Sequence, residues 1–228
     1  MGSSYSGTSV TSFPQTLNNR SLDALKRELA TFVGGETRKD TLVRAQEALF
    51  EAVRAFNSWS WTFNRVTEDI TLVAATGSYT LSSNWRNPLR AQMVDASGFT
   101  QCDVDWLKWS DWVKMFPDQS STGSIPLLYT AINIHETGQL TVDPVPAATL
   151  TYPTLRLFYH RRIEAPSGGG DVLEVPEEVE QAIFDEAIWR FLRKMKTFRE
   201  AREAQASAIV SRAQLSQEYR DFEDYYGS

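Results

Sequence analysis

The chain has 228 residues, of which 42% are hydrophobic and 23% are charged, and its formal net charge is −6. This composition is typical of a globular protein and excludes a disordered, collagen-like or coiled-coil chain. It also argues against a protein held on nucleic acid by bulk charge, because such proteins are basic. The single cysteine, Cys102, excludes a disulfide within the chain.

The chain begins with a segment rich in serine, threonine and glycine. Residues 1–20 lack the basic start and apolar run of a secretion signal, so we expect a flexible N-terminal segment. No stretch approaches the roughly 18 apolar residues of a membrane span. We therefore expect a soluble protein in a reducing compartment, with no membrane partner.

Two amphipathic helices are predicted next. Ser21 is a suitable N-cap for a helix over residues 22–33, and Gly34-Gly35 would end it. Asp40 would cap a longer helix over residues 41–59, whose apolar side chains repeat every three and four positions. The short connection predicts that these helices form an antiparallel pair.

The hydrophobic period then changes to that of β-strands, separated by turns rich in glycine, asparagine, aspartate and proline. The predicted strands cover residues 70–74, 78–82, 88–96, 127–135, 139–143 and 154–163. Residues 104–116 break this pattern, because Trp106, Trp109, Trp112 and Met115 are spaced by three. This spacing predicts a short helix with a tryptophan stripe along one side.

The clearest linker is Ser167-Gly168-Gly169-Gly170, and helical sequence follows it as far as Tyr226. Pro176 suits the start of this helical sequence. The stretch is longer than ordinary helices of globular proteins, so we expect two helices with a break near 196–199 or 207–211.

Helices, then strands, then helices in one chain predict an α+β fold. We expect a helical bundle built from the N- and C-terminal helices, with residues 21–65 and 171–228 contributing to it. An antiparallel β domain over residues 66–165 is expected to be inserted between these two parts.

Catalytic motifs are missing: the sequence has no glycine-rich phosphate loop, His-Glu-x-x-His helix, Gly-x-Ser-x-Gly turn or paired cysteines. His135 and His160 could hold a metal only together with Glu136 or Asp143, and ordinary strand residues are the simpler interpretation. Cys102 beside a histidine would make a nucleophile pair, but no local motif supports it. We therefore predict no enzyme activity, no cofactor and no metal.

Aromatic residues make up 12% of the chain, and most of its tryptophans lie between Trp59 and Trp112. Exposed tryptophans stack on sugar rings, so Trp85, Trp106, Trp109 and Trp112 could form a carbohydrate-binding face. Aromatic side chains are also enriched in protein cores and subunit interfaces. We favour the second interpretation and predict a subunit or tail interface at Trp85, Trp106, Trp109 and Trp112.

Charge is segregated in the C-terminal helical sequence. Basic residues cluster between Arg190 and Arg202, where they could contact an acidic partner or nucleic acid, or form a solvated helix face. Acidic and aromatic residues are mixed from Glu218 onward. Because so many exposed aromatic groups are costly in water, we expect this segment to dock on the bundle or on a partner.

Several short motifs follow one another in a characteristic order over residues 21–200. In chain order they are Ser58-Trp59-Ser60-Trp61-Thr62-Phe63-Asn64, Asp69-Ile70-Thr71-Leu72, Gly77-Ser78-Tyr79-Thr80-Leu81, Pro88-Leu89-Arg90, Leu140-Thr141-Val142-Asp143-Pro144-Val145-Pro146, Leu155-Arg156-Leu157-Phe158-Tyr159, Val175-Pro176-Glu177-Glu178 and the helix from Ala182 to Phe191. In this order the chain resembles the head-to-tail adaptor proteins of tailed bacteriophages, of the tail-tubular-protein-A-like kind.

This resemblance implies a structural virion protein of the head-tail connector, assembled in the host cytoplasm. Such proteins form a homo-oligomeric ring, commonly a dodecamer, under the portal protein. Their β domain faces the tail nozzle or tail tube, and DNA passes through the channel during ejection without specific binding. The resemblance implies that the C-terminal segment docks on the portal, through Leu215, Tyr219, Phe222, Tyr225 and Tyr226.

Two other functions stay open from the sequence. The protein could be a carbohydrate-binding or cell-wall-degrading phage tail component, in which tryptophans contact sugars and paired carboxylates cleave them. It could also be a general α+β interaction module of a cellular protein.

Overall fold

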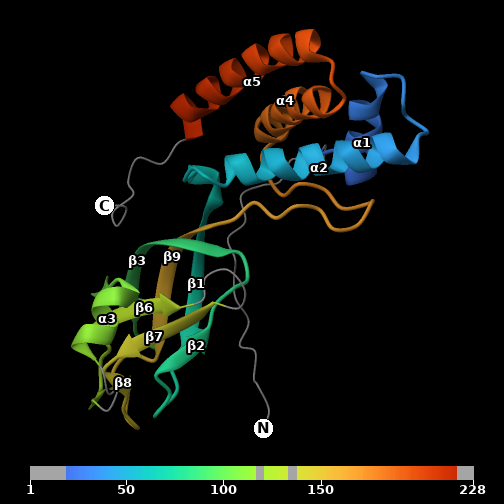
Figure 1. Ribbon diagram of the computed structural model, residues 1–228. Helices are drawn as coiled ribbons and strands as arrows, with labels where there is room; N and C mark the ends of the chain where they lie inside the picture. The colour runs from blue at the N-terminus through green and yellow to red at the C-terminus, as the bar shows by residue number, and fades with distance from the viewer. Residues whose placement is uncertain (1–18, 117–120, 133–137, 220–228) are drawn as a thin grey trace. The chain divides into compact units, whose positions relative to one another are not determined.

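The computed structural model describes residues 19–116, 121–132 and 138–219. These residues form two compact units, one within Arg65–Arg161 and the other of residues 19–64 and 162–219 (Figure 1). Helices come first and last in the chain order, and the strands lie between them. The predicted α+β fold class is therefore confirmed.

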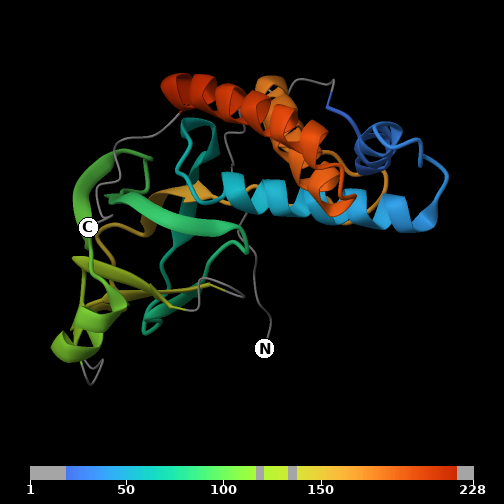
Figure 2. The same ribbon diagram turned by 45° about the horizontal axis from the view of Figure 1, so that its top comes forward.

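The helical unit is a bundle in which α4 packs against both α2 and α5, and α1 packs against α2 (Figure 1, Figure 2). Its elements are α1 (Leu22–Thr31), α2 (Lys39–Phe56), the 3-10 turn η1 (Thr62–Asn64), α4 (Glu177–Lys194) and α5 (Phe198–Tyr219). The apolar faces of these helices meet in one core, whose most buried members include Leu25, Leu29, Leu49, Phe56, Ile183 and Phe191.

Local signals explain where the first two helices begin and end. Ser21 Oγ accepts a hydrogen bond from the backbone N–H of Ala24 at 3.3 Å, which confirms the predicted N-cap. After α1, Gly34 adopts φ +63°, a conformation that glycine reaches without strain. The predicted cap at Asp40 is wrong, because the N-cap of α2 is Arg38. Asp40 lies instead in the first turn, where a carboxylate stabilises the positive end of the helix.

The long C-terminal stretch is two helices, as the sequence predicted. The break between α4 and α5 lies at residues 195–197, beside one of the two predicted positions. Lys196 has φ +62°, and Thr197 Oγ1 donates a hydrogen bond to the carbonyl of Leu192 at 2.9 Å. This bond satisfies one of the carbonyls that α4 leaves unpaired at its end.

Residues 167–170, predicted as a linker, are folded against the start of α1. Asp171 Oδ2 accepts a hydrogen bond from the backbone N–H of Gly168 at 2.6 Å, and this bond holds the pKa of Asp171 below its ordinary value. The carbonyl of Gly169 accepts a hydrogen bond from the N–H of Asp23 at 3.0 Å. The segment is therefore an ordered turn and not a free linker, because an aspartate binds its backbone and the backbone binds a helix.

The β unit contains a main sheet with the strand order β1-β9-β3-β4-β6-β7-β2. Its strands are β1 (Arg65–Thr71), β2 (Ser78–Thr80), β3 (Trp85–Val94), β4 (Thr100–Trp106), β6 (Leu128–Ile132), β7 (Gln139–Asp143) and β9 (Thr154–Arg161). A short second sheet pairs β5 (Thr122–Gly123) with β8 (Val145–Pro146). Most neighbours are antiparallel, as expected, but β4 and β6 are parallel, so the sheet is mixed.

Each predicted strand overlaps a strand of the structure, but β4 and the two-residue strands β5 and β8 were missed. The predicted helix over residues 104–116 is in fact the end of β4 followed by a shorter helix, α3 (Trp109–Met115). Asp95 Oδ1 accepts hydrogen bonds from the backbone N–H groups of Ser97 and Phe99, which forms the turn that brings β4 beside β3. Val104 pairs with β3, and Asp105 and Trp106 pair with β6, so strand pairing decides the conformation of residues whose tryptophan spacing alone favours a helix.

Strands of the main sheet alternate inward and outward side chains, as their period of two requires. The inward side chains form a second core, whose members include Val66, Ile70, Met93, Val104, Leu155 and Leu157.

Candidate functional site

The tryptophans predicted as interface residues lie in different surroundings within the β unit. Trp85 and Trp106 form one aromatic group, with ring centroids 6.0 Å apart, and Trp106 also meets the ring of Tyr129 edge-on at 5.2 Å. Trp85 is 1% exposed, so its side chain is packed inside the β unit. The structure therefore brings these two residues together as packing around the sheet.

Trp109 and Trp112 both belong to α3 but differ in exposure. Trp112 is 1% exposed and its ring lies 4.9 Å from that of Phe116, whereas Trp109 is 42% exposed. The predicted stripe is therefore divided, because Trp106 belongs to a strand and only Trp109 of the four is an exposed side chain.

Three apolar side chains of α3 are exposed beside the polar residues Ser110 and Lys114. Trp109 and Val113 are four residues apart and share one side of the helix, and both are exposed, as is Met115. We call Trp109, Val113 and Met115 the α3 surface. Exposed apolar groups gathered on one element are typical of an interaction surface. The sequence analysis missed Val113, although a four-residue step from Trp109 would have found it.

Two of the residues predicted to dock on the portal are engaged inside the helical unit. Leu215 is 6% exposed and belongs to the helical core. Tyr219 meets the ring of Phe63 edge-on, with centroids 5.8 Å apart. Both side chains therefore attach the end of α5 to its own unit. The other three predicted docking residues, Phe222, Tyr225 and Tyr226, lie outside the described residues.

The outer side of α5 was missed from the sequence. α5 buries Ala201, Ala208 and Leu215, yet Ile209 and Val210 are 62% and 56% exposed. We call Ile209 and Val210 the α5 surface. A helix that buries alanines and exposes larger aliphatic residues has its apolar side available for a partner.

Polar contacts hold α5 in this orientation. The Glu186 carboxylate, which is almost fully buried, pairs with Arg190 at 2.7 Å and with Arg212 at 2.6 Å. Ser211 Oγ donates a hydrogen bond to Asp185 at 2.7 Å. The guanidinium of Arg212 also lies over the ring of Phe56, 5.5 Å from its centroid. The side chains between α4 and α5 therefore fix which side of α5 faces outward.

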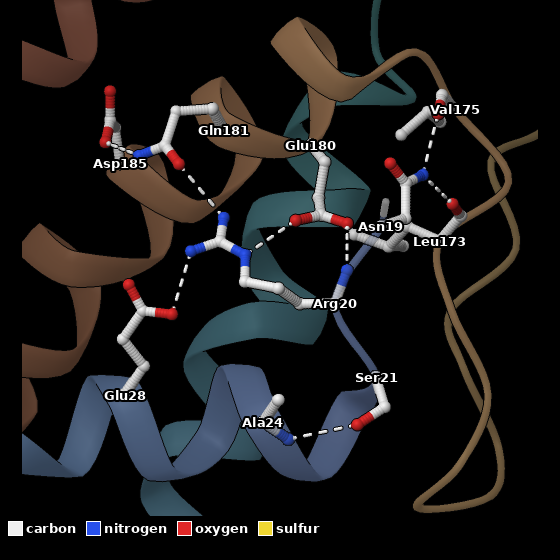
Figure 3. A network of polar contacts seen from close by, with 10 residues as sticks. All are labelled: Asn19, Arg20, Ser21, Ala24, Glu28, Leu173, Val175, Glu180, Gln181 and Asp185. Carbon is white, nitrogen blue, oxygen red and sulfur yellow. Dashed lines mark hydrogen bonds and ion pairs between the residues drawn. The ribbon is translucent and has the colours of Figure 1, made fainter. Parts of the chain in front are cut away.

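Figure 3 shows a second polar network, at the start of the described chain. The backbone N–H and the Nε of Arg20 donate to the two carboxylate oxygens of Glu180, at 2.9 and 2.7 Å. Arg20 Nη1 donates to Glu28 at 2.8 Å, and Asn19 donates to the carbonyl of Leu173 at 2.6 Å. Burial alone would lower the pKa of Arg20, but its bonds to Glu180 and Glu28 raise it. The network therefore ties residues from three parts of the chain to α4.

Those residues considered for chemistry that the structure describes do not form a reactive group. His160 is buried in β9, and Asp143 accepts a hydrogen bond from Ser121 Oγ at 2.7 Å. His135 and Glu136 lie outside the described residues. Burial, with a smaller effect from the Asp103 charge, raises the pKa of the Cys102 thiol, which is the opposite of what activates a nucleophile.

The described residues contain neither a metal-binding cluster nor a helix suited to a membrane. Within that part of the chain, no group of three His, Cys, Asp or Glu side chains is placed to hold a metal ion. No helix among the described residues has the length and apolar character needed to cross a membrane.

A charged groove of about 330 Å³ lies between α2 and α4. It is lined by Glu51, Trp189, Arg190, Arg193 and Lys194. Lys194 Nζ pairs with Glu51 at 2.9 Å, and the Arg190 guanidinium lies 4.8 Å from the centroid of the Trp189 ring. Arg193 has no charged partner among the described residues, so the groove has a cation available for an acidic ligand or partner.

Comparison with known proteins identifies the family. A family model described as SU10 adaptor protein matches residues 20–227, a span that includes every helix and strand of both units. No curated protein matches the chain. The matched family is one of structural phage adaptors and not of enzymes, which supports the broader resemblance; the tail-tubular-protein-A-like kind stays a prediction. Because the model covers most of its length, the chain belongs to the SU10 adaptor protein family.

Proposed function

We propose that the protein forms the adaptor ring between the portal and the tail of a phage virion. The family supports a structural phage adaptor and virion component. The proposal adds a homo-oligomeric ring, expected to be a dodecamer, that is assembled in the host cytoplasm and through which DNA leaves the head. The observation that carries it is an exposed apolar surface on each unit, the α3 surface and the α5 surface.

We assign the α5 surface, together with the segment that follows Tyr219, to the portal. Leu215 and Tyr219 are engaged in their own unit, so Ile209 and Val210 take their place in the docking surface. Phe222, Tyr225 and Tyr226 keep their proposed role. Aliphatic residues exposed beside an aromatic segment provide the apolar area that a stable interface needs.

The α3 surface is assigned to the tail nozzle, the tail tube or a neighbouring copy. Trp109 is the strongest candidate, because exposed tryptophans are the most frequent residues of high binding energy in interfaces. Trp85 and Trp112 are buried, so they would not contact a partner directly. Their proposed role is to stabilise the sheet and α3, which present the exposed residues.

Net charge fits the proposed passage of DNA. A basic channel would hold phosphates, whereas a chain with a net charge of −6 favours sliding without specific binding.

Portal binding by purified variants tests the proposal. Ile209→Asp/Val210→Asp and a chain that lacks residues 220–228 are both expected to bind the portal at least about tenfold more weakly, because each removes apolar contact area. Val43→Asp is the matched control: Val43 is exposed on α2 and lies outside the α5 surface, so portal binding is expected to persist. Co-purification detects portal binding, and bio-layer interferometry measures its affinity. Circular dichroism checks that each variant is folded. If both variants bind the portal as tightly as the wild type, the assignment of the α5 surface and the segment after Tyr219 to the portal is wrong.

A carbohydrate-binding role finds less support. It needs tryptophans that can stack on sugars, and Trp109 alone of the four predicted residues is an exposed side chain.

A further inference from the structure

The α4–α5 hairpin has an acidic end and a basic end. Residues 195–197 join the two helices, and Ser211 bonds to Asp185 halfway along both, so the helices run in opposite directions. The start of α4 and the end of α5 therefore lie together, as do the end of α4 and the start of α5 (Figure 1).

The acidic end contains Glu177 and Glu178 from α4 and Glu218 from α5, all exposed. Glu177 and Glu178 have no cationic partner among the described residues. Burial raises the pKa of Tyr219, and the negative charges of Glu218 and Glu178 raise it further. Acidic groups from both helices therefore contribute to the raised pKa of Tyr219.

The basic end contains Arg193, Lys196 and Arg202, which are exposed and have no anionic partner in the described part of the chain, together with the exposed Glu200 in the first turn of α5. Arg190 and Lys194 lie beside them but already pair with Glu51. The groove along Trp189 opens at this end, where Arg193 forms part of its lining. The basic end therefore offers unpaired cations beside an aromatic wall.

Helix dipoles do not explain this arrangement. The dipole of α4 favours acidic residues at its start and basic residues at its end. In α5 the same effect would favour a cation in the last turn, yet that turn contains Glu218 and no basic residue. The dipole therefore accounts for Glu200 in the first turn of α5 but not for the acidic residue in its last turn.

One copy cannot pair its own two ends. Glu178 and Arg193 are separated by 15 residues of a continuous helix, which at 1.5 Å per residue is about 22 Å. That distance exceeds the screening length of about 8 Å at physiological ionic strength. The unpaired charges of the two opposite ends can therefore meet only between different copies.

We propose that the acidic end of one copy binds the basic end of the next copy, head to tail. Glu177 and Glu178 of one copy meet Arg193 and Lys196 of its neighbour, beside the Trp189 groove. This inference rests on the proposed function, which needs a ring. A contact between two different surfaces closes into a ring when the rotation allows, whereas a contact of one surface with itself gives a twofold dimer.

Charge reversal provides the test. The variant Glu177→Lys/Glu178→Lys has two basic ends, and Arg193→Glu/Lys196→Glu has two acidic ends. Each alone is expected to self-associate at least about tenfold more weakly than the wild type, because like charges then face each other. An equal mixture of the two variants is expected to regain association, since every contact again joins opposite charges. Sedimentation velocity over a range of protein and salt concentrations measures this.

The control is Arg38→Glu/Lys39→Glu, which makes the same charge change at the start of α2. It is expected to associate like the wild type and not to rescue the variant with two basic ends. A wild type that stays monomeric at low salt, or a mixture as weak as its components, overturns the inference. Portal binding of the wild type is measured in parallel: its absence counts against the proposed function, whereas a failed rescue with portal binding intact counts against the head-to-tail contact alone.

Discussion

Glu68 is a carboxylate on the core side of β1. Its Oε2 accepts a hydrogen bond from the hydroxyl of Tyr159 at 2.9 Å, and its register partner on β9 is Leu157. Burial raises the pKa of Glu68 above the ordinary 4.5, although the bond from Tyr159 acts in the opposite direction. Burial, reinforced by the Glu68 charge, also raises the pKa of Tyr159, which keeps the hydroxyl protonated as a donor.

A pH-dependent stability follows from Glu68. Its pKa is higher in the folded than in the unfolded chain, so the native state binds its proton more tightly, and this group's contribution to stability falls as the pH rises above 4.5. Glu68→Gln keeps an acceptor for Tyr159 and removes the charge. We expect a higher free energy of unfolding than the wild type at pH 7, with the difference shrinking toward pH 4. Urea unfolding at both pH values measures it; a variant less stable than the wild type at pH 7 would contradict the argument.

At the scale of elements, α1 depends on a segment that is distant in the sequence. The N–H of Leu22 donates to the carbonyl of Asp171 at 2.8 Å, and the N–H of Asp23 donates to that of Gly169 at 3.0 Å. The first N–H groups of a helix have no partner within it, so this segment caps α1. A glycine permits the close approach, because a Cβ at residue 169 would collide with the Asp23 carboxylate.

Two neighbouring glycines test this packing. Gly169→Ala is expected to lower the free energy of unfolding by about 1–3 kcal/mol, because the methyl group has no room beside Asp23. Gly170→Ala is the control: a Cβ there meets nothing within 4 Å, so stability should stay within about 1 kcal/mol of the wild type. Guanidinium unfolding compares them, and equal effects of the two substitutions would show that the contact with Asp23 does not matter.

Elements with strong local signals were predicted correctly, whereas elements that depend on a neighbour were not. Ser21 caps α1, and the break after α4 lies near its predicted position. The helix expected over residues 104–116 begins only at Trp109, because residues 104–106 belong to β4 and pair with β3 and β6. The same spacing by three is found although Trp106 ends a strand and Trp109 and Trp112 lie in a helix. The spacing therefore could not distinguish one continuous helix from a strand followed by a helix.

At the scale of the whole molecule, the β unit has its two connections at one place. Arg65, the first residue of β1, is the register partner of His160 near the end of β9. The core of this unit shares no residue with the core of the helical unit. A sheet whose first and last strands are neighbours, with a separate core, has the topology of an insertion.

Independent folding of the β unit is the prediction at this scale. A fragment of residues 65–161 is expected to unfold cooperatively, because it contains a complete core and every strand of the main sheet. The shorter fragment 65–153 lacks β9, which lies between β1 and β3, and is expected not to fold. Circular dichroism during thermal unfolding, with two-dimensional NMR, measures both. The prediction is wrong if fragment 65–161 does not unfold cooperatively, whether or not fragment 65–153 does.

The sequence by itself determined the order of helices and strands, the cap at Ser21 and the presence of two C-terminal helices, because periodicity, capping and chain breaks act over a few residues. The family, too, could be approached from the order of short motifs. Only the tertiary structure decided that Trp85 is buried, that Ile209 and Val210 are exposed, and that the hairpin has opposite charges at its ends. These properties depend on which side of an element faces a distant partner, and that choice is made by the packing of the folded chain.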